Sequence, residues 1–303
     1  MQSITIGTRG SKLALWQAHW VQKQLHTLGA KTSIKIIKTT GDKITDIGLS
    51  KLGAKSASKG IFIKEIEEAL LNGEIDLAVH SLKDVPTEID KRLSISVIPK
   101  RADPRDALVG RRLDKLRRGD RIGTSSLRRA AQMKHLRPDV EIVDIRGNID
   151  TRLKKLDDNQ YDSILLAAAG LCRLGLENRI AEILESDVMV PAAGQGALAI
   201  ETRSDSDELL ALLSPIHDTE TETIVTAERA LLTAFGGGCQ VPLGAHAVLR
   251  GNTLTLNAVA VSSDGKLVIK VHHSSKPNQA NALGQKAAEQ LLSRGARKII
   301  DSL

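Results

Sequence analysis

The sequence predicts an α/β protein with two similar α/β domains in tandem, followed by a small α+β domain. Residues 1–98 alternate strand and helix patterns, which is typical of a mostly parallel sheet covered by helices. The same alternation restarts after Pro104 and includes a second Ile-Gly-Thr turn. From Thr219 the pattern changes to one helix, three alternating strands and a closing helix.

The first α/β domain is predicted to span residues 1–98, and the chain is predicted to return to it at residues 194–214. Ile4 to Thr8 alternates like a strand and stops at the turn Arg9-Gly10-Ser11. Apolar residues with helical spacing follow between Trp16 and Leu28. The remaining predicted elements are strands at residues 33–39, 75–80 and 93–98 and a helix over residues 62–70.

The second α/β domain is predicted over residues 103–191. Its segment Arg121 to Leu127 repeats the strand, turn and helix start of Ile6 to Ser11, with Ile-Gly-Thr in both. The matched order of elements on either side makes this short repeat more significant. The later elements are strands at residues 140–145 and 163–168 and a helix over residues 149–156.

Pro191 to Gly196 is a Gly- and Pro-rich break, and the apolar strand Ala197 to Glu201 follows it. We interpret this strand as the return of the chain to the first domain. The chain would then cross twice between the two domains, an arrangement suited to hinge closure around a ligand.

The third domain is predicted over residues 217–303 as an α+β unit. Thr219 and Glu222 resemble a capping box that starts a helix. Between this helix and the sheet lies Gly236-Gly237-Gly238-Cys239. The remaining elements are strands at residues 245–249, 253–261 and 266–272 and one helix over residues 280–303.

The charge, aromatic content and cysteines of the chain argue against several classes of function. The chain has 303 residues, a net charge of +7 and only 2% aromatic residues. Single-strand nucleic-acid binders usually stack bases on aromatic side chains, so carboxylate or phosphate ligands are the better expectation for the positive charge. No run approaches the roughly 20 apolar residues of a membrane helix, and no signal segment opens the chain. Cys172 and Cys239 form no metal-type pair, which fits a reducing, cytoplasmic location and no metal site.

Both Ile-Gly-Thr turns end a strand and begin a helix, where free backbone N–H groups and the helix dipole favour anions. Ligands of doubly wound sheets sit at the carboxyl ends of strands. Arginine binds carboxylates through paired hydrogen bonds, so a ligand with several carboxylates is expected, although each arginine alone is compatible with solvated surface charge. The candidates are Arg9 and Ser11 in the first domain and Ser125, Ser126, Arg128, Arg129, Arg146, Arg152 and Arg173 in the second.

Lys83 and Asp84 follow a predicted buried strand and precede a turn fixed by Pro86. A carboxylate there can transfer a proton or stabilise a developing cation, and a helix cap or turn residue is the alternative. The preceding His80 is expected to be a hydrogen-bonded core residue.

Cys239 follows three glycines, so it is either a nucleophilic or modified thiol or a buried structural one. Cys172 lies in an apolar stretch and is expected to be a core thiol.

Ten segments along the chain match, in order, the motifs of one known enzyme family. They are Thr8-Arg9-Gly10-Ser11, Leu13 to Ala18, Phe62 to Glu65, Ala78 to Pro86, Asp103 to Ala107, Gly123 to Arg129, Arg146-Gly147-Asn148, Thr151-Arg152-Leu153, Pro191 to Gly196 and Gly237 to Pro242. The chain therefore resembles the hydroxymethylbilane synthase, or porphobilinogen deaminase, family over essentially its full length.

The resemblance implies two domains like those of bilobal solute-binding proteins and a third that carries a dipyrromethane cofactor on a thioether to Cys239. It implies that four porphobilinogen molecules are added head to tail with loss of ammonia, and that water releases hydroxymethylbilane. Asp84 matches the catalytic aspartate of the family and is also expected to bind the cofactor. The family is expected to be monomeric. The residues that match its binders of cofactor and substrate carboxylates are Arg9, Ser11, Lys59, Lys83, Ser125, Ser126, Arg128, Arg129, Arg146, Arg152 and Arg173.

Two positions depart from the family pattern. Ala57-Ser58 stands where Gly-Gly is usual before Lys59, and Gly236 stands where Glu is common before Gly-Gly-Cys. The first change concerns a loop near the expected cleft, and neither touches the expected chemistry. Two other functions are the alternatives: a solute-binding protein, which would need neither the third domain nor Cys239, and a nucleic-acid-binding protein, which only the net charge favours.

Overall fold

The computed structural model describes residues 3–40, 63–237 and 241–301. Within these ranges the chain forms three sheets and groups into two compact units, which are described separately. The first unit contains residues 1–101 and 197–222, and the second contains residues 102–196 and 223–303. The second unit thus joins the regions predicted as the second and third domains, and the three-domain boundaries stay a prediction.

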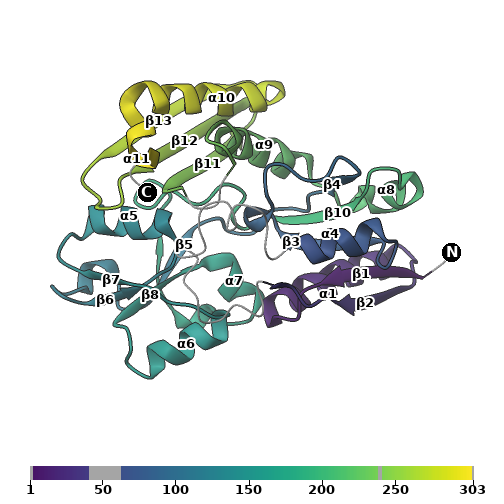
Figure 1. The fold of residues 1–303 in the computed structure, drawn as a ribbon, viewed down its shortest axis with the longest axis horizontal. Helices are drawn as coiled ribbons and strands as arrows, with labels where there is room; N and C mark the ends of the chain where they lie inside the picture. Colours follow the sequence, from purple (N-terminus) through teal and green to yellow (C-terminus); the bar gives the residue numbers. More distant parts are fainter. Residues whose placement is uncertain (1–2, 41–62, 238–240, 302–303) are drawn as a thin grey trace. The chain divides into compact units, whose positions relative to one another are not determined.

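The first unit is built on a five-stranded sheet of order β2-β1-β3-β10-β4 (Figure 1). Strands β1, β2 and β3 are parallel, whereas β10 runs antiparallel to both of its neighbours. The predicted return of the chain to the first sheet is therefore confirmed. The strands are β1 (Ile4–Thr8), β2 (Thr32–Ile36), β3 (Leu77–Ser81), β4 (Leu93–Val97) and β10 (Leu198–Arg203), and the helices are α1 (Lys12–Thr27), α4 (Lys64–Leu71) and α8 (Asp207–Leu213).

The second unit contains a five-stranded sheet of order β7-β6-β8-β5-β9. Its strands β6, β7 and β8 are parallel, and β5 is antiparallel to its neighbours β8 and β9. This order repeats that of the first sheet, with one antiparallel strand in the fourth place. The strands are β5 (Asp106–Gly110), β6 (Arg121–Gly123), β7 (Glu141–Val143), β8 (Ser163–Ala167) and β9 (Ile180–Leu184), and the helices are α5 (Leu127–Leu136), α6 (Ile149–Asp157) and α7 (Ala168–Arg173).

The third sheet is an antiparallel meander of β11 (Leu243–Arg250), β12 (Thr253–Val261) and β13 (Val268–Ser275). Helix α10 (Ala280–Leu291) lies along the sheet (Figure 1), and its apolar side chains share a core with the strands and with α9 (Thr219–Ala234). Gly284 allows α10 and α9 to approach closely, because a Cβ there would lie 2.3 Å from the Ala227 carbonyl oxygen.

The prediction of a single closing helix over residues 280–303 is wrong. Helix α10 ends at Leu291, a wider turn follows, and α11 (Arg297–Asp301) begins after it. The interruption is caused by Gly295, whose φ of 101° is incompatible with a continuous helix. Among the described residues, no helix is long and apolar enough to cross a membrane.

Candidate active site

The carboxyl ends of β1 and β3 lie at the same edge of the first sheet, because the two strands are adjacent and parallel, with Gly7 opposite Ala78. The turn after β1 carries Arg9 to the start of α1. Ser11 caps this helix, and its Oγ accepts a hydrogen bond from the Ala14 N–H at 3.3 Å. The structure therefore places the predicted anion turn at the expected edge of the sheet.

The turn after β3 brings Lys83 and Asp84 to this edge. It is a single 3₁₀ turn, Leu82–Asp84, in which Leu82 is buried and Asp84 is exposed. The Leu82 N–H donates to the Ala197 carbonyl at 3.0 Å, which holds the turn against the returning chain. The buried Gln17 of α1 donates from Nε2 to the Ser81 Oγ at 2.9 Å. Asp84 thus lies on a turn that is fixed from two sides.

His80 and Glu201 form a buried pair behind this turn. The His80 Nε2 lies 3.0 Å from a Glu201 carboxylate oxygen, and the two side chains are 5% and 0% exposed. The expectation that His80 is a hydrogen-bonded core residue is confirmed. Nearby, burial and the charges of Glu201 and Asp90 raise the pKa of Glu67 to about 7, although His80 acts in the opposite direction.

We expect Glu67→Gln to raise the melting temperature at about pH 8 and to change it little at about pH 4. A carboxyl whose pKa is raised by folding destabilises the folded state as the pH rises from 4.5, where the unfolded group ionises, to about 7. Thermal unfolding at both pH values measures the effect. Glu68→Gln, at an exposed position next to it, is the matched control. Equal shifts at both pH values would show that ionisation of Glu67 is not the cause.

The second sheet repeats the arrangement with Ser125 and Ser126 after β6. Ser126 caps α5, and its Oγ accepts a hydrogen bond from the Arg129 N–H at 3.4 Å. The exposed Ser125 donates from Oγ to the Ile145 carbonyl at 2.5 Å. The bond of Ser125 connects the turns after β6 and β7, two parallel strands that end at the same edge.

Arg128 and Arg129 are directed at a buried aspartate, Asp106, at this same edge. Asp106 is the first residue of β5 and lies opposite Ala167, the last residue of β8. Arg128 Nη1 lies 2.6 Å from one Asp106 oxygen, and Arg129 Nε lies 2.9 Å from the other. Burial alone would raise the pKa of Asp106, but the two guanidinium groups hold it well below its usual range.

Two cations around one carboxylate leave a net positive charge in this buried cluster. Gln195 completes it, because its Nε2 donates to Asp106 at 2.8 Å and to the Pro104 carbonyl at 2.7 Å. Arg128 Nε is buried and has no hydrogen-bond partner in the part of the chain that the structure describes. Such an unsatisfied donor is costly to bury, so the cluster is suited to an additional anionic ligand.

We expect Arg128→Leu and Arg129→Leu each to lower stability as well as product formation. Each removes one partner of the fully buried Asp106, and breaking a buried ion pair costs about 3–5 kcal/mol. These two arginines are therefore expected to stabilise the fold as well as to contact the ligand. Arg146→Leu is the control, because its pair with the exposed Asp144 contributes about 0–1 kcal/mol. Urea unfolding measures the free energy of unfolding of all three variants. An equal loss in the Arg146→Leu control would contradict a stabilising role of the buried pairs with Asp106.

The other predicted arginines of the second sheet have separate surroundings. Arg146 Nε lies 3.1 Å from Asp144, just before α6. Arg152, in the first turn of α6, donates to the Gly147 carbonyl at 2.7 Å. Arg173, at the end of α7, donates to the Gly196 carbonyl at 2.7 Å, and burial lowers its pKa to about 10. All three follow strands β7 or β8, so they belong to the same edge as Asp106.

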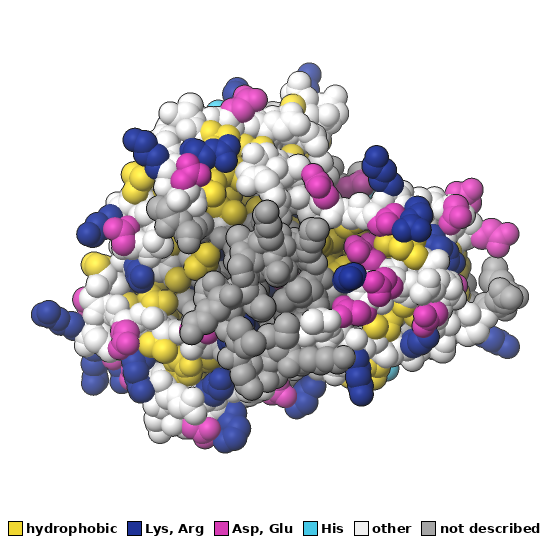
Figure 2. Space-filling model, viewed as in Figure 1, with side chains coloured by type: hydrophobic (Ala, Val, Ile, Leu, Met, Phe, Trp, Pro, Cys, Tyr) yellow, Lys and Arg dark blue, Asp and Glu magenta, His cyan; other side chains and the backbone are white. Residues whose placement is uncertain are grey.

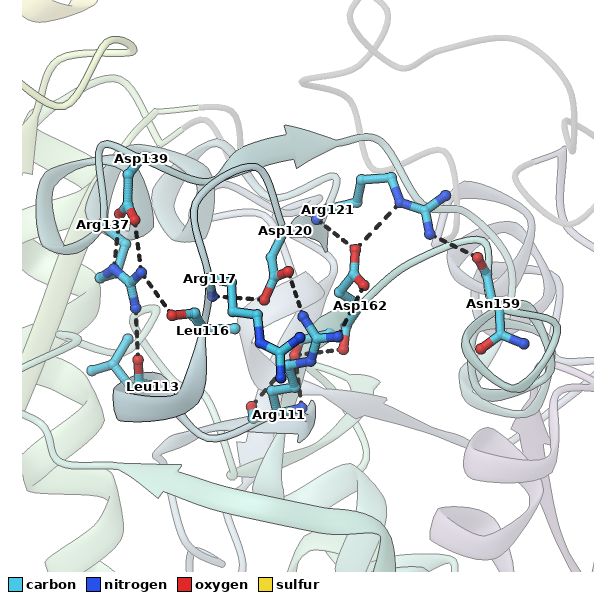
Figure 3. A network of polar contacts seen from close by, with 11 residues as sticks. Arg111, Leu113, Leu116, Arg117, Asp120, Arg121, Arg137, Asp139, Asn159 and Asp162 are labelled. Carbon is cyan, nitrogen blue, oxygen red and sulfur yellow. Dashed lines mark hydrogen bonds and ion pairs between the residues drawn. The ribbon is translucent and has the colours of Figure 1, made fainter.

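A second set of basic residues lies at the opposite edge of this sheet, where β6 and β8 begin (Figure 3). Arg111 pairs with Asp120 and lies 3.6 Å from Asp162, whose carboxylate also accepts from the Arg121 N–H at 2.9 Å. Arg137 pairs with Asp139 at 2.8 Å. The pairs of Asp162 with Arg111 and Arg121 join separate segments, and Arg137 also donates to the Leu113 carbonyl at 2.9 Å, so this part of the positive charge is structural.

Cys172 is exposed, and the expectation that it is a core thiol is wrong. The four residues before it in α7 are buried, but Cys172 lies in the last turn of this short helix, where its side chain is exposed to solvent. Partial desolvation, followed by the charges of Glu177 and Asp103, raises the pKa of the Cys172 thiol. Its reactive thiolate is therefore disfavoured at neutral pH. Lys59 and Cys239 lie outside the described residues.

Asp106 and Gln195 were not among the residues proposed from the sequence. Both lie in matched segments, Asp103 to Ala107 and Pro191 to Gly196. The sequence signal for both is a polar side chain within a segment that matches the family.

Comparison with known proteins identifies the family of the chain. Residues 4–211 match the family described as porphobilinogen deaminase, dipyromethane cofactor binding domain, and residues 223–293 match the porphobilinogen deaminase C-terminal domain. The chain belongs to the porphobilinogen deaminase family. The porphobilinogen deaminase of Syntrophotalea carbinolica is 52% identical over 306 aligned residues, which cover 99% of this chain and 96% of the relative. The porphobilinogen deaminase of an Exiguobacterium species is 50% identical, and the alignment covers 100% of this chain and 99% of the relative.

Among solved structures, a probable amino-acid ABC transporter extracellular-binding protein from Bacillus subtilis is similar with a TM-score of 0.41 and 12% identity. The match covers 71% of this chain and 92% of that chain. The two five-stranded sheets of this chain share one strand order.

Proposed function

We propose that this chain is a porphobilinogen deaminase that condenses four porphobilinogen molecules head to tail, releases ammonia and yields hydroxymethylbilane. The observation that carries the proposal is the pair of family matches, which together extend from residue 4 to residue 293. The exposed carboxylate of Asp84 and the basic edge of each sheet supply the residues that this chemistry needs.

The residues fit a dipyrromethane cofactor. Each pyrrole unit of such a cofactor carries an acetate and a propionate, so the ligand is a polycarboxylate. Guanidinium, ammonium and hydroxyl donors at a strand edge suit carboxylates, and the buried net positive charge around Asp106 adds to this. When bound, dipyrromethane supplies a free pyrrole α-carbon as the point of chain extension. The proposed holding residues are Arg9, Ser11, Lys59, Lys83, Ser125, Ser126, Arg128, Arg129, Arg146, Arg152 and Arg173, with Cys239 as the attachment point.

Asp84 is proposed to act on the substrate. Loss of ammonia from porphobilinogen leaves an electrophilic methylene carbon whose positive charge is shared with the pyrrole nitrogen. A carboxylate held near that N–H stabilises the cation and can take up the proton that leaves the α-carbon after bond formation. Asp84 is exposed at the end of a fixed turn, so its carboxylate is available for this role.

We further propose a cytoplasmic monomer that does not bind nucleic acid. On the face shown in Figure 2, lysine and arginine side chains are interspersed with aspartate and glutamate, which supports small acidic ligands over a continuous phosphate backbone. Size-exclusion chromatography and binding to duplex DNA at low salt test these two points.

The proposed activity is tested by incubating the purified protein with porphobilinogen and measuring ammonia release and porphyrin absorbance after oxidation. We expect one ammonia for each porphobilinogen consumed. A solute-binding protein would bind porphobilinogen without consuming it, and that result would overturn the proposal.

A further inference from the structure

Glu228 is a fully buried carboxylate on α9 that the site described above does not include. Its Oε2 accepts a hydrogen bond from the Gly194 N–H at 2.8 Å, and its Oε1 accepts one from the Ala247 N–H at 2.8 Å. Its exposed fraction is 0%. One side chain therefore connects three segments of the second unit: helix α9, strand β11 and the turn Pro191–Gly196.

The turn that Glu228 holds also carries Gln195 into the arginine cluster. Gln195 donates to Asp106 at 2.8 Å, and its Oε1 accepts from Arg129 Nη2 at 3.3 Å. The turn is tight, because Gly196 has a φ of 86° and a Cβ there would lie 2.5 Å from the Ala102 carbonyl oxygen. A displacement of Gly194 would therefore move the neighbouring Gln195.

Helix α9 leads in sequence to the proposed attachment point. It ends at Ala234, and Cys239 follows five residues later. A cofactor that is bound to Cys239 and held through its carboxylates by Arg129 is fixed at two points. The position of α9 relative to the arginine cluster must therefore be constant. Glu228 connects them through the Gly194 N–H to the neighbouring Gln195, whose Oε1 accepts a hydrogen bond from Arg129.

We propose that Glu228 is a positioning residue for the cofactor and substrate carboxylates, which fixes helix α9 and the arginine cluster relative to each other through the turn Pro191–Gly196. This inference rests on the proposed function. A purely structural role is the alternative, because a buried carboxylate that accepts two backbone N–H groups also stabilises the fold.

Glu228→Gln in the full chain separates the two roles. Glutamine keeps the size of the side chain but has only one acceptor oxygen, so either the Gly194 or the Ala247 N–H loses its partner. Glu220→Gln is the matched control, because Glu220 is an exposed residue of the same helix. Three quantities are measured: amide hydrogen exchange of peptides covering 191–196 and 243–250, the rate at which cofactor-free protein gains covalent mass from porphobilinogen, and the melting temperature.

We expect faster exchange in one or both peptides of Glu228→Gln, and covalent loading slowed about 10- to 100-fold, the usual effect of misplacing a bound group by about 1 Å. Loading is assayed well below the melting temperature, where the variant is folded. A merely structural role predicts wild-type loading there, and that result would overturn the inference. Unchanged exchange at both peptides would overturn the contact itself. If wild-type protein gains no mass, the proposed function fails, whereas the exchange result still stands.

Discussion

Asp84→Asn is expected to lower turnover by roughly 10²–10⁴-fold, the usual effect of removing one positioned acid–base group, with little loss of stability. The turn Leu82–Asp84 is held by the burial of Leu82 and by the bond from the Val85 N–H to the Leu82 carbonyl at 3.1 Å. The exposed carboxylate contributes little to either, so asparagine should leave the turn in place. Activity would fall because an amide can neither take up a proton nor stabilise a cation as a carboxylate does.

Steady-state turnover with porphobilinogen and the melting temperature should be measured on the same preparation. Glu88→Gln is the control, since Glu88 is an exposed carboxylate a few residues further along the same segment. It should keep wild-type turnover. Near-normal turnover in a folded Asp84→Asn protein would remove Asp84 from the mechanism.

Cys239→Ser is expected to abolish covalent loading and nearly all activity. A thiolate is the nucleophile that forms a thioether, and a serine hydroxyl is far less reactive near neutral pH. The protein should still fold, because the exchange replaces one atom. Intact-mass measurement after incubation with porphobilinogen, together with turnover, tests this expectation.

Cys172→Ser is the matched control and should keep both the added mass and the activity. Cys172 is exposed and its raised pKa disfavours the thiolate, so it is a poor competitor for loading. Because Cys172 is exposed, its replacement by serine should not lower stability as the replacement of a core thiol would. Loss of the added mass in Cys172→Ser, with retention in Cys239→Ser, would reverse the assignment.

The alternation of strands and helices was enough to predict both α/β regions. The return of β10 to the first sheet was an interpretation of the Gly- and Pro-rich break before this strand, because periodicity alone does not show which sheet a strand joins. Strands β5 and β9 were not predicted. In β5 the apolar residues Ala107 to Val109 form a run of only three between a charge and a glycine, too short to be recognised by periodicity. Their place in the sheet depends on pairing with the distant β8, which no local pattern reveals.

The candidate site was predictable only in part, for a similar reason. The predicted start of a helix after the second Ile-Gly-Thr turn indicated where Arg128 and Arg129 lie. It did not indicate which residues they contact. Their partner Asp106 comes more than twenty residues earlier, and the antiparallel insertion of β5 brings it to the edge. The contacts of Glu228 with Gly194 and Ala247 likewise depend on tertiary packing.

The mass of the intact purified protein, measured after denaturation with a thiol reductant, shows whether Cys239 carries the cofactor. Thioethers resist reductants that cleave disulfides, so a dipyrromethane on Cys239 should survive this treatment. We predict the sequence mass plus two linked pyrrole units, with the addition mapped by proteolysis to the peptide that contains Cys239. The unmodified mass in fully active protein, or an addition on Cys172, would contradict the account.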